Sequence, residues 1–558
     1  MKNFLLGITN CSRNSYLILI TSVVCLHYFC LILGANVFIH RPYGFTLSLI
    51  KPIEDVEGYI SFFNQTAFGR AIYNLFSSML GFYYADFLVY GFWVLFSSVA
   101  ACMFFLFVTE QLSESKKKSL STKMTLAALC GLSFVFFGRK LYNLSTFLSI
   151  QEWFTAHPLI EFLRSIYNPQ GTWFTRFYQP GFALSGALLG LWEIERLKKI
   201  DHKFWLNGVG LISSVFIICI YPWIALTFLI YLAFKIMELR NQKALAILLC
   251  SVACGLTFFL LFGFDKGHSD FLKRISTVQS RLPDTGVFQA NLFLLILCLP
   301  FYRSRIGKTL FQLQLANVFA ILSPVILGYS VQAPHYFHWS SLVLTLWLWC
   351  FLEWVLHKTK GVKTTPINLK LIIASIGFLS LLALREQMIW KYRNYFFIPE
   401  AQVDKIKKAQ SECGITGKAR YFFSTDIALY WSIPARSLCQ NLIPLGWGDR
   451  KLSNLQIASL YLASMLYFKI YTSKSDFLND LESHLKNLGS PVRELTRNQL
   501  EYSLKSRFYY HMMWYLFSTS QAHAGAKEQI RALFEGLDPA QEIQYIKELD
   551  ENRLILRL

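Results

Sequence analysis

Residues 245–262 read LAILLCSVACGLTFFLLF, a run without a charged side chain. Residues 371–384, LIIASIGFLSLLAL, form a second such run, and similar runs recur along the chain before residue 385. A helix needs about 20 mostly apolar residues to cross the hydrocarbon core of a bilayer, whereas a membrane β-barrel shows short alternating segments. Continuous runs therefore predict an all-α polytopic membrane protein.

The composition of the 558 residues agrees with this prediction. Hydrophobic residues make up 54% of the chain and charged residues only 16%. A formal net charge of +20 would suggest a nucleic-acid partner in a soluble chain. Much of this excess lies in short loops beside apolar runs, where basic residues orient a membrane protein. We therefore expect the lipid bilayer as a partner and no nucleic acid.

About eleven apolar segments are predicted to be transmembrane helices. Basic clusters such as Lys116-Lys117-Lys118 recur in every second loop, and the positive-inside rule places these loops in the cytoplasm. The N-terminus is then cytoplasmic, and the chain beyond the last segment lies outside a cell inner or plasma membrane. The predicted segments are 15–39, 87–108, 124–138, 178–194, 204–220, 222–237, 244–264, 288–302, 309–329, 339–356 and 368–385. The helix break between the fifth and sixth follows from Tyr221-Pro222-Trp223, because proline lacks a backbone donor.

Two domains are predicted from the fall in hydropathy near residue 385. The first, 1–385, is the transmembrane domain with outer loops 40–86 and 139–177. The second, 386–558, is a mainly α-helical extracytoplasmic domain with amphipathic patterns over 454–486 and 496–535.

The predicted outer domain contains Cys413 and Cys439. Cysteines outside the cytoplasm can be oxidised, but the spacing leaves open whether these two are bridged.

The first outer loop combines an acidic cluster with a mostly apolar stretch. Glu54, Asp55 and Glu57 form the cluster, and residues 59–84 follow it. This stretch carries few charges, which is typical of a helix that lies in the membrane interface. Carboxylates held beside a bilayer would suit an enzyme that acts on membrane-embedded substrates, although a solvated loop would show them too.

Groups that could bind a phosphate come from the two outer loops and from a third outer segment, the turn at 332–339. Basic side chains form charge-assisted hydrogen bonds with phosphate oxygens. The candidates are Lys51, Arg164, Arg176, His335 and His338, together with Tyr336 beside the two histidines. Each of these residues also has an interpretation without a ligand. Arg176 could extend its side chain to the lipid headgroups, and His335 and His338 could belong to a turn at the membrane interface.

The chain lacks the motifs of ATP-driven pumps and zinc proteases. It contains no G-x-x-x-x-G-K-[ST], no H-E-x-x-H and no C-x-x-C pair. Ionisable residues are sparse inside the apolar segments, which weakens a transport function without excluding it. A transporter or a non-catalytic assembly subunit is therefore kept as an alternative.

An acidic first outer loop, interfacial helices and an outer C-terminal domain together resemble the GT-C superfamily of membrane glycosyltransferases. Arg176-Phe177-Tyr178-Gln179-Pro180 and His335-Tyr336 are similar to motifs of bacterial GT-C-like proteins. The resemblance implies a GT-C-like fold, a polyprenyl phosphate or diphosphate sugar donor, and juxtamembrane helices over 58–84 and 147–166. The W-W-D-x-G motif of the oligosaccharyltransferase branch is absent, so transfer to asparagine is not implied.

The resemblance predicts transfer of a sugar to a glycan, lipid or protein acceptor on the extracytoplasmic face. Such transfer needs a base for the acceptor hydroxyl, for which Asp55 is the first candidate and Glu54 the second. The leaving phosphate needs positive charge, from basic side chains or from Mg²⁺ or Mn²⁺ held by Glu54, Asp55 and Glu57. An O-antigen-type ligase or polymerase, which would depend on Arg176 and His335, is the enzymatic alternative.

Overall fold

The computed structural model describes most of the chain in segments and divides it into two compact units. Unit 1 comprises Met1–Phe45, Val89–Phe264 and Ser280–Asn394, and unit 2 comprises Thr46–Leu88, Asp265–Gln279 and Tyr395–Leu558. The described residues are 13–39, 67–81, 84–111, 123–135, 181–197, 204–239, 241–258, 260, 277–278, 281–328, 330–331, 333–358, 400–413, 417–425, 429–443, 452–487 and 526–558.

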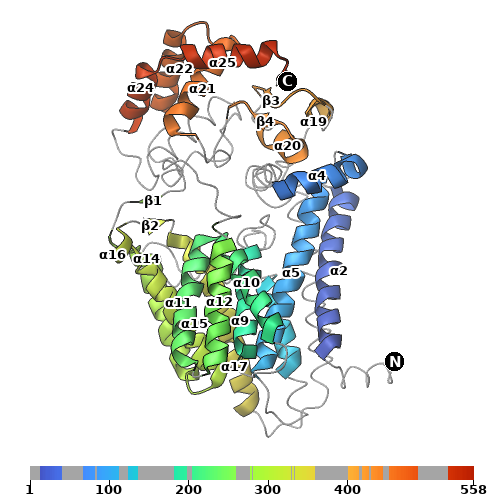
Figure 1. The fold of residues 1–558 in the computed structure, drawn as a ribbon, viewed down its shortest axis with the longest axis vertical. Coiled ribbons are helices and arrows are strands. Elements are labelled where there is room, and N and C mark those ends of the chain that lie inside the picture. Colours follow the sequence, from blue (N-terminus) through green and yellow to red (C-terminus); the bar gives the residue numbers. More distant parts are fainter. Residues whose placement is uncertain are drawn as a thin grey trace. The chain divides into compact units, whose positions relative to one another are not determined.

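Unit 1 consists of apolar helices, several of which lie side by side in one bundle (Figure 1). Helix α5 begins in unit 2 and belongs to unit 1 from Val89 onward. The elements are α2 (Arg13–Ile39), α5 (Tyr84–Glu110), a helix over Lys123–Val135, α9 (Gly181–Leu197), α10 (Phe204–Cys219), α11 (Pro222–Glu238), α12 (Gln242–Phe258), α14 (Thr285–Cys298), η5 (Leu299–Phe301), α15 (Arg305–Ile321), α16 (Pro324–Leu327), β2 (Ser330–Val331), η6 (Ala333–Tyr336) and α17 (Phe337–Lys358).

Local sequence explains where these helices begin. Pro222 occupies the first turn of α11, where a missing N–H costs nothing, and Tyr221 before it is extended with φ −126°. The side chains of Asp284 and Ser304 accept hydrogen bonds from backbone N–H groups at the starts of α14 and α15. Such caps satisfy amide donors that have no partner within the helix. The predicted helix break at Tyr221-Pro222-Trp223 is thus observed.

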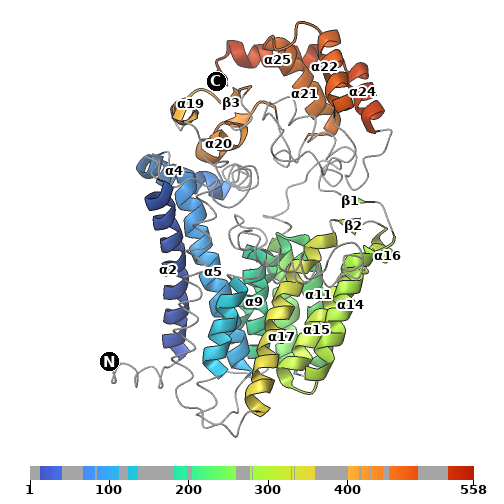
Figure 2. The same cartoon turned by 180° about the vertical axis from the view of Figure 1, so that it is seen from behind.

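Glycines allow α9, α10 and α12 to pack closely. A Cβ atom at Gly190 of α9 would lie 2.4 Å from Ser214 Oγ and 2.5 Å from Phe228 Cζ, and one at Gly255 of α12 would lie 2.7 Å from Val215 Cβ. Larger residues would overlap these neighbours, so the close helix approach depends on glycine. On the other side of the bundle α15 packs against α11, α14 and α17 (Figure 2).

The prediction of about eleven transmembrane helices in a GT-C-like fold is wrong. Helices lie at the predicted positions that the structure describes, and 368–385 is outside the described residues. In the described part, one helical segment, Arg305–Leu327, is long and apolar enough to cross a membrane. Seven other apolar stretches of 10–17 residues lie there, and two of them, Arg13–Leu26 and Val94–Glu110, are parts of the 27-residue helices α2 and α5.

Unit 2 combines helices with a small parallel sheet, whereas the sequence analysis predicted a mainly α-helical domain without locating a sheet. The central strand β3 pairs with β4 and β5, so that Tyr421 lies opposite both Gln440 and Ile555. Strands of two or three residues are too short to show an alternating pattern. The elements are α4 (Ala67–Leu80), β1 (Thr277–Val278), α19 (Glu400–Glu412), β3 (Tyr421–Phe423), α20 (Leu429–Arg436), β4 (Gln440–Asn441), α21 (Asn454–Tyr467), α22 (Lys474–Asn487), α24 (Ala526–Gly536), α25 (Ala540–Glu551) and β5 (Ile555–Arg557).

The amphipathic stretch 454–486 forms two helices, α21 and α22, and not one. Ser453 and Gln456 close a capping box at the start of α21, and Lys469 after its end has a φ of 57°, which turns the chain back. The rings of Phe477 and Phe534 lie 5.0 Å apart between α22 and α24. Of the second predicted stretch, 496–535, the described part begins at α24.

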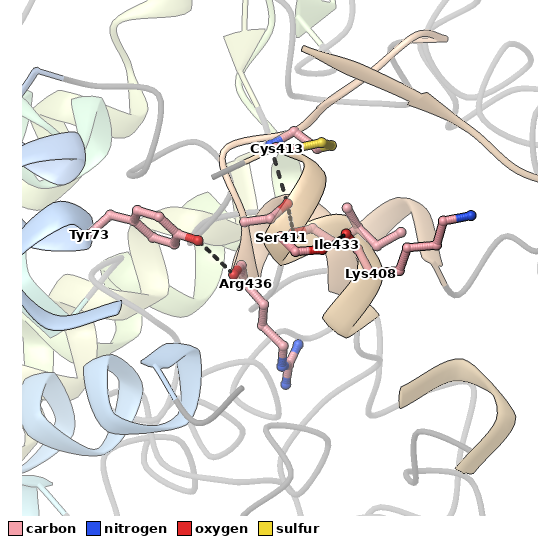
Figure 3. Close-up of a disulfide and its surroundings, with 8 residues drawn as sticks. Tyr73, Lys408, Ser411, Cys413, Ile433 and Arg436 are labelled. Carbon is pink, nitrogen blue, oxygen red and sulfur yellow. Dashed lines mark hydrogen bonds between the residues drawn. A yellow bond between two sulfur atoms is a disulfide. The ribbon is translucent and has the colours of Figure 1, made fainter. Parts of the chain in front are cut away.

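A disulfide joins two elements of unit 2. Cys413, directly after α19, is bonded to Cys439, which follows α20, and their Cα atoms lie 5.2 Å apart (Figure 3). The sequence had left this pairing open. The bond links the packed helices α19 and α20 covalently.

Candidate functional site

Two histidines and two other aromatic side chains meet where α11 and α17 begin. Tyr221 precedes α11 and Trp223 lies in its first turn. His335 lies in the short helix η6, and His338 lies in the first turn of α17. We call Tyr221, Trp223, His335 and His338 the ring cluster. All four belong to unit 1.

The ring cluster is held by stacking and by a hydrogen bond. The imidazole of His335 stacks on the indole of Trp223 with ring centroids 4.3 Å apart and planes 25° apart. The hydroxyl of Tyr221 is hydrogen-bonded to Nδ1 of His335. The rings of His335 and His338 lie 5.4 Å apart, and the Tyr221 ring is 5.6 Å from His338. His338 is buried, whereas His335 is partly exposed.

Buried amide side chains position the turn that carries the two histidines. Nδ2 of Asn317 in α15 donates to the carbonyl oxygen of Tyr336 at 3.4 Å, to Oγ of Ser340 at 3.1 Å and to Oδ1 of Asn291 at 2.9 Å. The hydroxyl of Ser340 donates to Asn291 Oδ1 at 2.7 Å. Thr227 of α11 donates to Asn317 Oδ1 at 3.4 Å. This amide network joins α11, α14, α15 and α17 beneath the ring cluster.

The ring cluster offers groups for a phosphorylated ligand. Imidazole changes its charge near neutral pH, so it can bind a phosphate oxygen as a cation or transfer a proton. The hydrogen bond between Tyr221 and His335 fixes the orientation of the imidazole ring through Nδ1. The face of Trp223 provides apolar contact for a flat or ring-shaped group. These properties are those of a binding site with proton-transfer capacity.

The structure describes only part of the site predicted from sequence. His335 and His338 lie together, with ring centroids 5.4 Å apart. Tyr336 lies between them in sequence with its side chain buried, and its carbonyl oxygen accepts hydrogen bonds from the amide network. The other predicted residues lie outside the described residues; they are Lys51, Glu54, Asp55, Glu57, Arg164 and Arg176.

A metal site was an open expectation for the acidic cluster. Among the described residues no group of three or more His, Cys, Asp and Glu side chains could hold a metal ion. His335 and His338 would supply two nitrogen ligands at most. The residues expected to hold Mg²⁺ or Mn²⁺, namely Glu54, Asp55 and Glu57, are outside the described part.

Sequence reasoning missed several residues of this region. Tyr221 and Trp223 were considered only as flanks of a helix break. Asn291 and Asn317 have polar amide side chains that are not ionisable, so a count of ionisable residues in the apolar segments does not include them. The signal was present, since Gln314 and Asn317 stand three apart, on one helix face, in an otherwise apolar segment.

A different cluster lies at the other end of α11. Nζ of Lys235, which is 2% exposed, donates to Glu238 Oε2 at 2.9 Å and to Gln312. Gln312 Nε2 and Lys308 Nζ of α15 lie 2.6 Å and 2.8 Å from Glu238 Oε1. Burial acts to raise the pKa of Glu238, but hydrogen bonds from Lys308, Lys235 and Gln312 outweigh it and lower the pKa to about 2. We call this set the charge network.

Comparisons with known proteins identify no relative. No protein-family model matches the chain, and neither a characterised protein nor a solved structure matches it.

Proposed function

We propose that the protein is a glycosyltransferase that takes a sugar from a polyprenyl phosphate or diphosphate lipid and transfers it to an acceptor outside the cytoplasm. The observation that carries the proposal is the ring cluster, in which the imidazole of His335 stacks on Trp223 and is hydrogen-bonded to Tyr221. An imidazole can hydrogen-bond a phosphate, and the face of an aromatic ring can pack against a sugar ring. A phosphate-linked sugar would use both groups.

The proposed reaction assigns each group a role. The acceptor hydroxyl oxygen forms a bond to the anomeric carbon of the sugar while the bond from that carbon to the phosphate oxygen breaks. The hydroxyl proton passes to a carboxylate, which the sequence assigns to Asp55 or Glu54. The partly exposed His335 hydrogen-bonds the leaving phosphate and stabilises its negative charge, with the buried His338 packed beside it. Arg176, Arg164 and Lys51 are the further proposed phosphate partners.

Apolar surface in unit 1 supports a lipid-borne substrate. Ile296 of α14 is 54% exposed and Ile326 of α16 is 86% exposed, although soluble monomers seldom gather large apolar side chains on their surface. The segment Arg305–Leu327, which carries Asn317 of the amide network, is long and apolar enough to cross a bilayer. An isoprenoid chain would find apolar contacts next to such helices.

The disulfide supports an extracytoplasmic position for unit 2. Disulfides form and persist in oxidising compartments and are rare where thiols are kept reduced. Cys413 and Cys439 are bonded, whereas the free thiols among the described residues all belong to the apolar helices of unit 1. An enzyme that uses a donor on the outer face would carry such a domain on that side.

The test is a transfer assay with purified full-length protein, a radiolabelled polyprenyl phosphate sugar and a cell-envelope acceptor fraction. We expect His335→Ala to reduce transfer about 1,000-fold, within the range for loss of an acid–base or charge-stabilising group. Tyr302→Ala is the matched control, because Tyr302 is an exposed aromatic residue of unit 1, and it should retain activity.

Asp55→Asn and Glu54→Gln separate the proposal from its alternatives. Loss of transfer in Asp55→Asn and in His335→Ala supports the proposed transferase. If His335 is essential while both carboxylates are dispensable, the protein is better explained as an O-antigen-type ligase or polymerase. If the wild-type protein transfers no sugar from any polyprenyl donor, it is better explained as a transporter or an assembly subunit.

A further inference from the structure

Glu193 is a carboxylate buried between two packed helices of unit 1. It lies near the end of α9 and is 3% exposed. Helix α10 packs on it so closely that a Cβ atom at Gly210 would lie 2.6 Å from Oε1 of Glu193. The carboxylate therefore occupies the space that glycine leaves open in the contact between α9 and α10. An ionised group in such a place is costly unless it is well paired.

Arg196 of the same helix compensates this burial only in part. Its Nη1 lies 3.4 Å from Oε1 and 3.3 Å from Oε2 of Glu193. The same guanidinium lies over the indole of Trp192, 4.6 Å from the ring centroid. Strong charge-assisted hydrogen bonds measure about 2.7–2.9 Å, so these longer contacts stabilise the ionised carboxylate weakly.

Charged groups on the neighbouring elements do not improve the pairing of Glu193. Glu110 at the end of α5 repels a second negative charge, and Arg13 of α2 pairs with Glu110 at 3.1 Å. Helix α10 has no ionisable side chain between Phe204 and Ile218. Burial is the largest influence and raises the pKa of Glu193, Arg196 lowers it and Glu110 raises it, which places this pKa at about 7. The other titratable side chains of α9 and the neighbouring α11 are Glu195, which pairs with Arg305 of α15, and Tyr231, Lys235 and Glu238.

An acceptor suited to a protonated carboxyl lies on the facing side of α10. Asn207 stands three residues before Gly210 and so on the same face of the helix. Ser214 continues this face, and its hydroxyl donates to the carbonyl oxygen of Gly186 in α9 at 2.7 Å. Asn207 is 7% exposed, and within the described part of the chain its Oδ1 accepts no hydrogen bond. A neutral carboxyl can donate the hydrogen that this oxygen lacks, whereas a carboxylate cannot.

We propose that Glu193 is a pH-sensitive switch for the packing of α10 on α9. When the carboxyl holds a proton, it donates a hydrogen bond to Oδ1 of Asn207 and the two helices stay in close contact. When the proton passes to water, the carboxylate is held by Arg196, the amide oxygen repels it, and the start of α10 loosens from α9. The switch concerns the packing of unit 1 and does not depend on sugar transfer.

Hydrogen exchange of the full-length protein, followed by mass spectrometry, tests the switch. Peptides over residues 204–210 are compared between wild-type protein and Glu193→Gln at equal pH, which cancels the pH dependence of intrinsic exchange. Glutamine is neutral and donates a hydrogen bond at every pH. We expect equal protection at about pH 6 and at least about tenfold faster exchange of the wild-type protein at about pH 8. Glu353→Gln is the matched control, because Glu353 is a half-buried carboxylate of unit 1 paired with Lys123, and its exchange at 204–210 should equal that of the wild-type protein.

Two further variants keep the carboxyl and test the switch even where Glu193→Gln fails to fold. Arg196→Met removes the cation that stabilises the carboxylate and should raise the midpoint of the transition by about one pH unit. Asn207→Leu removes the acceptor of the protonated form and should lower the midpoint by about the same amount. Identical exchange of wild-type protein and Glu193→Gln at every pH overturns the proposal. A midpoint that neither Arg196→Met nor Asn207→Leu moves also overturns it, because another group would then titrate.

Discussion

The two ends of α11 carry polar groups of opposite kinds. At its start the ring cluster holds two imidazoles by ring contacts and by a hydrogen bond between Tyr221 and His335. At its end the charge network surrounds the buried cation of Lys235 with Glu238 and Gln312. Helix geometry of 1.5 Å per residue separates the two ends by roughly 24 Å.

The charge network consists of groups that pair with one another, whereas the ring cluster is the proposed ligand site. In the charge network, carboxylate, ammonium and amide groups satisfy one another and tie α11 to α15. A buried ion pair with complete partners contributes mainly to the arrangement of helices. In the ring cluster the same bundle presents proton-exchanging rings on a turn that the amide network holds in place. We therefore propose that ligand binding takes place at the start of α11, whereas the charge network at its end ties α11 to α15.

The largest effect on stability is expected from breaking the charge network on one side only. Glu238→Ala leaves the buried ammonium of Lys235 without its carboxylate, and the free energy of unfolding should fall by about 3 kcal/mol. Lys235→Met removes the buried charge itself and should cost less than about 1 kcal/mol. Denaturant unfolding of the purified variants measures both. If both variants lose the same free energy of unfolding, the cost does not come from leaving the charge of Lys235 unpaired, and this account of the charge network is wrong.

A smaller loss is expected from the amide network. Asn317→Ala leaves Asn291, Ser340 and the Tyr336 carbonyl without a shared donor in a buried region, which should lower the free energy of unfolding by about 2 kcal/mol. The exposed Asn74 of α4 is the matched control, and Asn74→Ala should change stability by less than about 0.5 kcal/mol. If the two variants unfold alike, the network does not hold the turn in place.

The hydrogen bond within the ring cluster should affect the rate more than the stability. Tyr221→Phe keeps the ring stacked but removes the hydroxyl that orients His335, and transfer should slow about tenfold with the donor KM little changed. Tyr302→Phe at an exposed site is the control and should leave the rate unchanged. A tenfold rise in KM with an unchanged kcat would mean that Tyr221 binds the donor directly.

The smallest expected effect is the contribution of Glu238 to the loss of stability in acid. Because the folded protein holds the pKa of Glu238 near 2, below its ordinary 4.5, its contribution to stability is complete above pH 4.5 and is lost as the pH falls toward 2. Unfolding midpoints over this range should fall in the wild-type protein, and Glu238→Gln should show a shallower fall. If the unfolding midpoints of the two proteins fall equally with pH, Glu238 does not contribute to the loss of stability in acid.

Local signals in the sequence predicted helix positions well and membrane crossing poorly. Proline after Tyr221 and apolar runs such as 245–262 lie where helices begin or extend. At 288–302 the apolar run did not measure the length of one helix, because it continues from the end of α14 at Cys298 through the short helix η5, Leu299–Phe301. The short strands β3, β4 and β5 form only through pairing between distant segments, which no local pattern encodes.

The sequence predicted the parts of the candidate site that are close in sequence and missed the parts that only packing brings together. His335 and His338 are close in sequence, so their proximity in space followed from a single turn. Trp223 joins them from another helix, and only the packing of α11 against η6 and α17 brings it there. Asp55 and Arg176, outside the described residues, stay predictions.

Binding of a labelled polyprenyl phosphate without sugar to the purified protein tests the central claim most directly. The measurement compares wild-type protein with His335→Ala at one end of α11 and Lys235→Met at the other. We expect His335→Ala to weaken binding by about tenfold or more, since a charge-assisted hydrogen bond to phosphate is lost, and Lys235→Met to leave the Kd unchanged. An unchanged Kd in His335→Ala, or a weaker one in Lys235→Met, would contradict the assignment of the ring cluster as the phosphate site.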